Sequence, residues 1–301
     1  MALPIAPPPE GTPRWRAAEI FLGTYAAIVA VTAVSRVGLS RGNWLVALAN
    51  VLIILCLWLV TRPGLGPTGR ILREAMPLVL VLVGYAALDV LSGGGQLRAH
   101  DDVILAWEEA AFGMQPARDW WRGHTSTFWS TLLHGVYFCY YLILAVPAFF
   151  FLLRGDWPAF RRLTRNVVCT FCVCFLIFVL YPVAGPYYVF ERPTGLMVDN
   201  LPAHMVYAAL ASGSSFGAAF PSSHVAAATA AGIAAFSGNR TLGWILLVPV
   251  LLMPIATVYT QMHYALDAIV GVLVGLVVPL VAARMEGTLK EREGELQTRE
   301  G

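Results

Sequence analysis

The chain has 301 residues, of which 58% are hydrophobic and 13% are charged, and its mean hydropathy is +0.67. This composition leaves too little polar surface for a water-soluble globule and indicates an integral membrane protein. The formal net charge is only +2, and no basic run is interleaved with aromatic residues, so the sequence excludes a nucleic-acid-binding class.

The chain begins with a proline-rich segment, residues 1–16, which we expect to be a disordered cytoplasmic leader. The apolar run that follows, residues 17–35, is preceded by Arg14 and Arg16 and could be mistaken for a secretory signal. It is longer than the hydrophobic part of such a signal and lacks a convincing small-residue cleavage site. We therefore interpret it as a retained first membrane span.

Apolar runs of membrane-spanning length recur along the chain. A bilayer core of about 30 Å needs roughly 20 apolar residues of helix, and backbone polar groups in lipid must be satisfied within the helix itself. The sequence thus predicts an all-α integral membrane protein with about eight transmembrane helices, at 17–35, 44–61, 75–92, 131–153, 165–183, 219–236, 241–260 and 264–284.

These runs, together with the leader at residues 1–16, divide the chain into four regions. Residues 17–74 hold two additional N-terminal transmembrane helices, residues 75–285 a six-helix catalytic membrane core, and residues 286–301 a charged cytoplasmic tail. With the N-terminus inside, fourteen of the twenty Lys and Arg residues fall on the cytoplasmic side. This bias predicts that both termini are cytoplasmic, in an integral membrane protein of the plasma membrane.

The segment between the third and fourth spans differs from the apolar runs in its residue pattern. Acidic residues alternate there with large apolar residues at helical spacing, and Trp120 and Trp121 follow. This pattern predicts an amphipathic helix at about residues 100–122, lying in the outer interface with the two tryptophans as anchors. Such a helix could cover a site.

The five cysteines lie inside apolar runs. Cys169 and Cys172 form a C-x-x-C, but no second ligand pair follows and no redox-type βαβ pattern surrounds it, so we interpret both as small apolar packing residues. The sequence predicts no metal site and no cofactor.

Three polar clusters interrupt the second half of the chain, and the predicted topology places all of them on the outer face. Residues 181–192 leave the fifth span, residues 220–224 enter the sixth, and residues 263–267 enter the eighth. A single histidine at such a position is usually an interhelical hydrogen-bonding residue. Two histidines and an aspartate on one face instead favour a catalytic site.

His263 and Asp267 are separated by four residues on one helix, so their side chains share a face and the carboxylate can accept a hydrogen bond from imidazole Nδ1–H. That bond would leave Nε2 free as a nucleophile towards phosphorus. His224 could act as general acid and then as general base. Ser222 and Ser223 precede it at a helix N-terminus, where free N–H groups bind anions.

Further residues are candidates for contacts with a phosphate or a polar headgroup. Arg192 is the cation near the clusters and matches phosphate in shape, although an interfacial arginine can equally face lipid headgroups. The Gly185-Pro186 turn is a helix terminator that could also allow close approach of a substrate. The other candidates are Asp89, Arg98, His100, Asp101, Tyr187 and His204.

The spacing Pro-Ser-x-His at 221–224, followed by His-x-x-x-Asp at 263–267, resembles the type 2 phosphatidic acid phosphatase superfamily, whose motifs read Lys-x6-Arg-Pro, Pro-Ser-Gly-His and Ser-Arg-x5-His-x3-Asp. The resemblance covers about residues 75–284. It implies a six-helix core and metal-independent chemistry through a phosphohistidine at His263. It also implies lipid-phosphate substrates such as phosphatidic acid, isoprenoid phosphates or phospholipid head groups.

Some motif residues of that family are absent. Gly185 stands where the motif lysine would be, Ser223 replaces the motif glycine, and Ala256-Thr257 replaces Ser-Arg, so two phosphate-binding cations are missing. With the run at 108–116, these departures resemble the inositol phosphorylceramide synthase branch.

The acceptor of the phosphoryl group, water or an alcohol, stays open. The alternative is a non-catalytic lipid or phosphate transporter that retains the fold, although no inverted repeat is visible.

Overall fold

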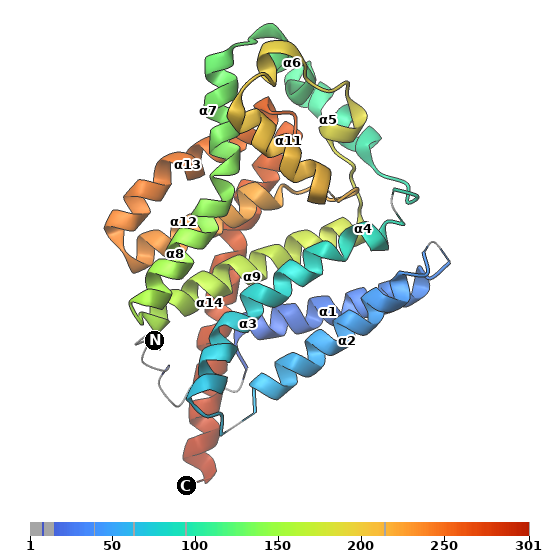
Figure 1. Ribbon diagram of the computed structural model, residues 1–301. Helices are drawn as coiled ribbons and strands as arrows, with labels where there is room; N and C mark the ends of the chain where they lie inside the picture. Colours follow the sequence, from blue (N-terminus) through green and yellow to red (C-terminus); the bar gives the residue numbers. More distant parts are fainter. Residues whose placement is uncertain are drawn as a thin grey trace.

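The computed structural model describes Pro8 and residues 15–38, 40–62, 64–93, 95–213 and 215–300. Most of the leader expected at residues 1–16 lies outside these ranges. Within them the chain folds into helices, with an isolated bridge between Val183 and Ala218 and no named strand (Figure 1). The expected all-α membrane fold is confirmed.

The helices follow one another with short connections. They are α1 (Ala17–Ser35), α2 (Asn43–Val60), α3 (Pro67–Ala86), α4 (Leu88–Leu91), α5 (Asp101–Phe112), α6 (Pro116–Gly123), α7 (Thr127–Phe138), α8 (Tyr140–Leu153), α9 (Trp157–Leu180), α10 (Pro186–Val189), a 3₁₀ turn (Gly195–Met197), α11 (Leu201–Gly213), α12 (Ser223–Gly238), α13 (Arg240–Tyr259) and α14 (Ala265–Glu300).

Seven helical segments in the described residues are long and apolar enough to cross a membrane, one fewer than the eight expected. The sixth expected span, 219–236, corresponds to α12, which has 16 residues. At 1.5 Å per residue it is about 24 Å long, shorter than a bilayer core of about 30 Å. Its end at Gly238 lies against Phe151, near the end of α8. Because α12 is short and ends level with α8, the start of α12 does not reach the other end of the bundle and is recessed within it.

The centre of the bundle is α9, which is 72% buried over its apolar window, compared with 28–44% for the other six spans. Asp156 caps its first turn by accepting from the Ala159 N–H at 3.1 Å. Helix α12 packs against α9, and the many alanines of α12 permit a close approach. Helix α1 also packs against α9.

Two glycines set the distance between α12 and α14. Gly271 and Gly275 form a G-x-x-x-G on α14. A Cβ at Gly275 would lie 2.5 Å from the carbonyl oxygen of Ala226, and one at Gly271 would lie 2.7 Å from that of Ser222. Such small residues allow the backbones of membrane helices to approach closely. This contact holds the start of α12 beside the start of α14.

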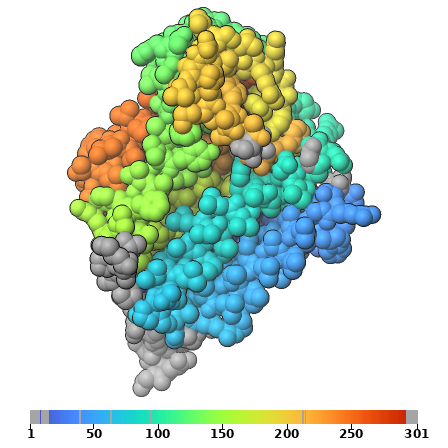
Figure 2. All heavy atoms as spheres, viewed as in Figure 1, coloured from blue at the N-terminus to red at the C-terminus, as the bar shows by residue number. Residues whose placement is uncertain are grey.

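At the upper end of Figure 1, α5, α6 and α11 cover the bundle. The single interfacial helix expected at 100–122 is two helices, separated at Gly113, which has a left-handed φ of 64°. Trp121 is not the membrane anchor that we expected, because its side chain is buried and its indole N–H donates to Gln261. In the space-filling view, α11 forms part of the surface of this end (Figure 2).

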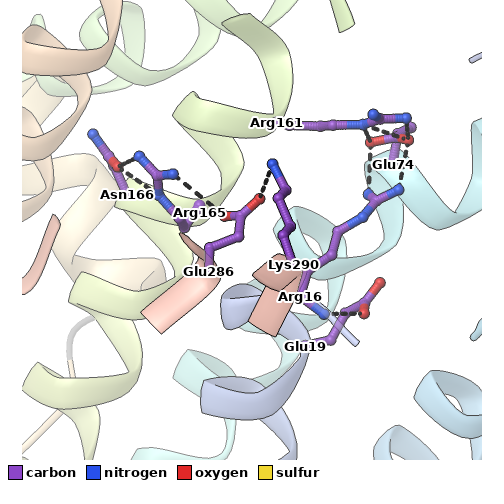
Figure 3. Close-up of polar contacts among 8 residues, drawn as sticks. All are labelled: Arg16, Glu19, Glu74, Arg161, Arg165, Asn166, Glu286 and Lys290. Atoms are coloured by element: carbon purple, nitrogen blue, oxygen red, sulfur yellow. Dashed lines mark hydrogen bonds and ion pairs between the residues drawn. The ribbon is translucent and has the colours of Figure 1, made fainter. Parts of the chain in front are cut away.

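The opposite end of the bundle holds a network of buried ion pairs. Glu74 at the start of α3 accepts from Arg16 at 2.8 Å and from Arg161 of α9 at 2.6 Å (Figure 3). A second pair joins Arg73 of α3 to Glu19 of α1 at 2.7 Å. These contacts tie the N-terminal helix pair to the rest of the bundle through charge-assisted hydrogen bonds.

The last helix passes beside this network. Glu286 of α14 pairs with Arg165 at 3.3 Å and with Lys290 at 3.7 Å (Figure 3). The charged segment that we expected to be a tail at 286–301 continues α14 as helix to Glu300.

Candidate active site

Two histidines from different helices face one another near the recessed start of α12. His224 lies on the first turn of α12, and His263 lies in the short turn between α13 and α14. Nδ1 of His224 is 3.3 Å from Nε2 of His263. The structure thus brings together two of the residues that the sequence singled out, from positions 39 residues apart.

The orientation of His263 differs in detail from the expected His–Asp pair. Its Nδ1 is 3.0 Å from the carbonyl oxygen of Ala219 and 3.5 Å from the carboxylate of Asp267. That carboxylate accepts instead from the backbone N–H of Tyr264 at 2.8 Å, which closes the start of α14 in the manner of a capping box. The Ala219 carbonyl therefore fixes the imidazole tautomer, and the Asp267 carboxyl group lies slightly farther away.

Burial keeps the His263 imidazole neutral. The side chain is 5% exposed, and this burial lowers its pKa to about 4. A neutral ring that donates from Nδ1 to Ala219 has its lone pair on Nε2. In this structure that lone pair accepts from Nδ1–H of His224, so a reacting group must replace this contact to reach Nε2.

A chain of hydrogen bonds continues through His224. Nε2 of His224 is 3.3 Å from the hydroxyl of Tyr137, and the rings of Tyr140 and His224 lie 4.5 Å apart. With Tyr137 donating to His224, His224 donating to His263 and His263 donating to Ala219, every ring nitrogen has one suitable partner while both imidazoles are neutral.

Ser222 and Ser223 shape the start of α12. The hydroxyl of Ser222 caps the helix by accepting from the Val225 N–H at 3.3 Å, and its own N–H donates to the Asp267 carbonyl at 2.9 Å. Ser223 lies beside His224 in the wall of a cavity. The first-turn N–H groups have no acceptor within an α-helix, so this helix start is suited to an anion.

The Gly185 turn lies directly behind Ala219. Gly185 has φ 95° and ψ 166°, a conformation that is essentially restricted to glycine. A Cβ on Gly185 would lie 2.8 Å from the Cβ of Ala219. Val183 fixes this arrangement by accepting from the Ala219 N–H at 3.0 Å. Gly185 therefore allows the close contact that places the Ala219 carbonyl under His263.

Two carboxylates of α5 reach into the site; the sequence offered Asp101 only as a loop residue that could contact a headgroup, and it did not indicate Glu108. Asp101 accepts from the N–H groups of Ala184 and Gly185 at 2.9 and 2.8 Å and from the Tyr264 hydroxyl at 2.9 Å. Glu108 accepts from the Leu266 N–H at 3.1 Å. A signal was present, because Asp101, Ile104 and Glu108 share one helix face.

Gln261 is a further residue that the sequence did not indicate. It has a left-handed φ of 60°, and its side chain is buried. Its amide oxygen accepts from Trp121, and its amide nitrogen donates to the Glu191 carbonyl at 3.0 Å. Gln261 thereby joins α6, the segment after α10 and the turn that carries His263.

The other polar candidates lie apart from the histidines. Arg192 is exposed and lies over the ring of Tyr187 at 4.4 Å. Asp89 is exposed on α4, and His100 stacks on Tyr181 at 4.2 Å. Within the described ranges, none of them contacts His224 or His263.

A cavity of about 160 Å³ opens beside His224. It lies among α3, α7, α8, α9, α11 and α12, and its lining is mostly aromatic and aliphatic, including Val81, Tyr85, Tyr140, Tyr141, Phe175 and Leu210. One polar end at Ser223 and His224 therefore meets a long apolar wall. This is the arrangement that an amphipathic molecule requires.

No group of three His, Cys, Asp or Glu side chains in the described part of the chain is arranged to hold a metal ion.

The searches of curated proteins and of solved structures found no match. A family model described as the PAP2 superfamily matches residues 103–281, which include the turn at Gly185, both histidines and Glu108 of α5. The match covers more than half of the chain, so the protein belongs to the PAP2 superfamily.

Proposed function

We propose that this protein is a metal-independent lipid-phosphate phosphatase or phosphotransferase that works through a phosphohistidine at His263. Membership of the PAP2 superfamily supports phosphatase-type or phosphotransferase-type activity in general. The observation that carries the finer proposal is the opposed pair of Nε2 of His263 and Nδ1 of His224, 3.3 Å apart at the polar end of an apolar cavity.

In the first half-reaction, the direct contact between His263 and His224 opens and a phosphoryl group takes its place between the two rings. Nε2 of His263 attacks phosphorus, the N–P bond forms, and the bond from phosphorus to the leaving oxygen breaks. A proton taken up with the negatively charged substrate makes His224 an imidazolium, which protonates the leaving oxygen. The Ala219 carbonyl and the Asp267 carboxylate stabilise the positive charge that develops on His263.

In the second half-reaction, His224 is the base. It removes a proton from water or from an alcohol, whose oxygen attacks phosphorus while the N–P bond breaks and His263 returns to its neutral form. The free N–H groups at the start of α12 stabilise the phosphate charge that the missing family cations would otherwise neutralise. This reduced set of cations is our reason for proposing the inositol phosphorylceramide synthase-like branch and for keeping transfer to an alcohol beside hydrolysis.

The cavity supports a lipid as the phosphate carrier. Its apolar wall would hold the beginning of a hydrocarbon chain, and its polar end would place the phosphate at His224. A water-soluble phosphate ester would leave this wall unfilled.

We also propose that the site faces the extracytoplasmic side of the plasma membrane. The buried ion pairs of Arg16, Arg73 and Arg161 lie at the end of the bundle opposite the histidines, as the positive-inside rule requires of a cytoplasmic end. His204, exposed on α11, tests this orientation. In cells, His204→Cys should react with a membrane-impermeant maleimide while Arg154→Cys should not; the reverse pattern would invert the topology.

The activity test uses purified protein in detergent with phosphate-labelled phosphatidic acid, isoprenoid phosphates and phospholipids, each with and without added alcohols. Free phosphate would identify a phosphatase, and a new lipid that depends on the alcohol would identify a transferase. His263→Ala should remove either product, His204→Ala should not, and EDTA should change neither. If no lipid is consumed, or if His263→Ala retains the wild-type rate, the proposal is wrong.

A further inference from the structure

Two buried carboxyl groups meet at the start of α14, and only one of them belongs to that helix. Asp267 accepts from the Tyr264 N–H at 2.8 Å, and Glu108 of α5 accepts from the Leu266 N–H at 3.1 Å. Both side chains are fully buried. The positive end of the helix dipole stabilises a single negative charge at this position, but two charges in the same buried turn would repel one another.

Each carboxyl group also has an oxygen without a partner. Oε2 of Glu108 and Oδ1 of Asp267 are buried, and neither has a hydrogen-bond partner among the described residues. Two ionised carboxylates cannot satisfy one another, because both groups only accept hydrogen bonds. A proton on Glu108 changes one acceptor into a donor, which would satisfy both atoms with one hydrogen bond.

We propose that Glu108 is a positioning residue that carries a proton and donates it to Asp267, so that the start of α14 holds one negative charge beside His263. This inference deepens the proposed function and rests on it for the role of His263. The single charge is assigned to Asp267 because its other oxygen accepts from the Tyr264 N–H at 2.8 Å and faces Nδ1 of His263 at 3.5 Å. Ionisation of Glu108 would repel Asp267 and loosen the turn that holds the imidazole.

The surroundings of Glu108 agree with this assignment. Burial raises the pKa of Glu108 to about 7, the charge of Asp267 adds to this effect, and the backbone N–H groups of Leu266 and Ala265 oppose it. The titratable groups facing the pair are Tyr264 and His263 of the preceding turn and Asp101 of α5, so no cation from these segments offsets the two acids. The next residue, Glu109, is exposed and provides a matched control on the same helix.

The first test needs no substrate and measures the melting temperature of the purified protein from pH 5 to pH 8. A carboxyl group whose pKa is raised in the folded state stabilises the fold below its unfolded pKa, and this stability is lost as the pH rises through about 7. The buried histidines change stability in the opposite direction below pH 6.5 in every variant, so the readout is the melting temperature relative to Glu108→Gln, which keeps an acceptor for Leu266 and gains a donor for Asp267. Relative to that variant, wild type and Glu109→Gln should lose melting temperature as the pH rises through about 7.

Asp267→Asn provides a second variant in case Glu108→Gln does not fold. Without the neighbouring charge, Glu108 should ionise at lower pH, so the loss of melting temperature should shift towards acid. If either variant keeps the pH dependence of Glu109→Gln, the proposal is overturned.

The second test is the pH profile of kcat/KM on a lipid phosphate. Above about pH 7, kcat/KM of wild type and Glu109→Gln should fall more steeply than that of Glu108→Gln, because ionisation of Glu108 adds to the proton that His224 requires in every variant. Glu108→Ala should be impaired at every pH. Since all variants share one substrate, its own ionisation cancels in the comparison. A profile of Glu108→Gln that matches wild type would contradict the role of Glu108, whereas inactivity of the wild type would contradict only the proposed function.

Discussion

Gly185→Ala should damage the site through its contact with Ala219. The added Cβ would lie 2.8 Å from the Cβ of Ala219, whereas two carbon atoms pack best at about 3.5–4.0 Å, so Ala219 must move by roughly 1 Å. The carbonyl of Ala219 holds Nδ1 of His263 at 3.0 Å, and this movement would pass directly to the imidazole. A misplacement of about 1 Å can cost about 100-fold in rate.

The same substitution should also destabilise the fold. The conformation of Gly185 costs an alanine about 1–3 kcal/mol, and the forced contact with Ala219 adds about 1–3 kcal/mol. Gly195→Ala separates the two effects, because Gly195 also has a positive φ, 61°, but its Cβ would meet nothing within 4 Å. It should cost about 1 kcal/mol and leave turnover unchanged.

The assay is kcat on a lipid phosphate together with the melting temperature of each variant in detergent. Gly185→Ala should lose about 100-fold in kcat at a temperature where it is still folded, and Gly195→Ala should lose only stability. A folded Gly185→Ala protein with wild-type kcat would refute the link from Gly185 through Ala219 to His263.

Glu74→Gln should lower the free energy of unfolding by about 3 kcal/mol, because it leaves Arg16 and Arg161 without their buried partner. Lys290→Gln, at an exposed pair, should change the free energy of unfolding by less than about 0.5 kcal/mol. Thermal melting of both variants measures this difference, and equal effects would contradict a stabilising network. Because burial lowers the pKa of His263 to about 4, kcat/KM should hold from pH 6 to pH 5 and fall only near pH 4, so an inflection near 6.5 would contradict a buried neutral nucleophile. The unfolded chain binds that proton more tightly, so stability should also decrease as the pH falls below 6.5.

Much of the fold could be predicted from the chain because lipid imposes a simple rule. Apolar runs of about 20 residues must be helices, and seven of the eight expected spans are present at full length. The sequence could not reveal that the helix carrying His224 is short. Its length depends on where the start of α12 is held against Asp267, and that contact is tertiary.

The two histidines could be anticipated from their spacing, but the groups that hold them could not. The acceptor for His263 is a backbone carbonyl of Ala219, which has no signal in a sequence. Alternating acidic and apolar residues made α5 resemble an interfacial helix with its acids in water. In the structure one acid of each adjacent pair, Asp101 and Glu108, points inward because backbone N–H groups of two other segments lie there.

Arg192 and Trp121 illustrate a second limit. Composition suggested a phosphate-binding cation and a membrane anchor. Arg192 lies exposed over Tyr187, apart from the histidines, and its role in phosphate binding stays a prediction, whereas Trp121 is buried against Gln261. Residue type restricts what a side chain can do, but the partner that it finds depends on packing between segments far apart in the chain.

The central claim is that His263 receives the phosphoryl group, and rapid quenching with a phosphate-labelled lipid tests it most directly. Wild-type protein should carry an acid-labile, base-stable label that mass spectrometry locates on His263. His224→Ala should retain the label longer because the base of the second step is missing, and His263→Ala should carry none. A label on another residue, or full turnover of lipid by His263→Ala, would contradict the account.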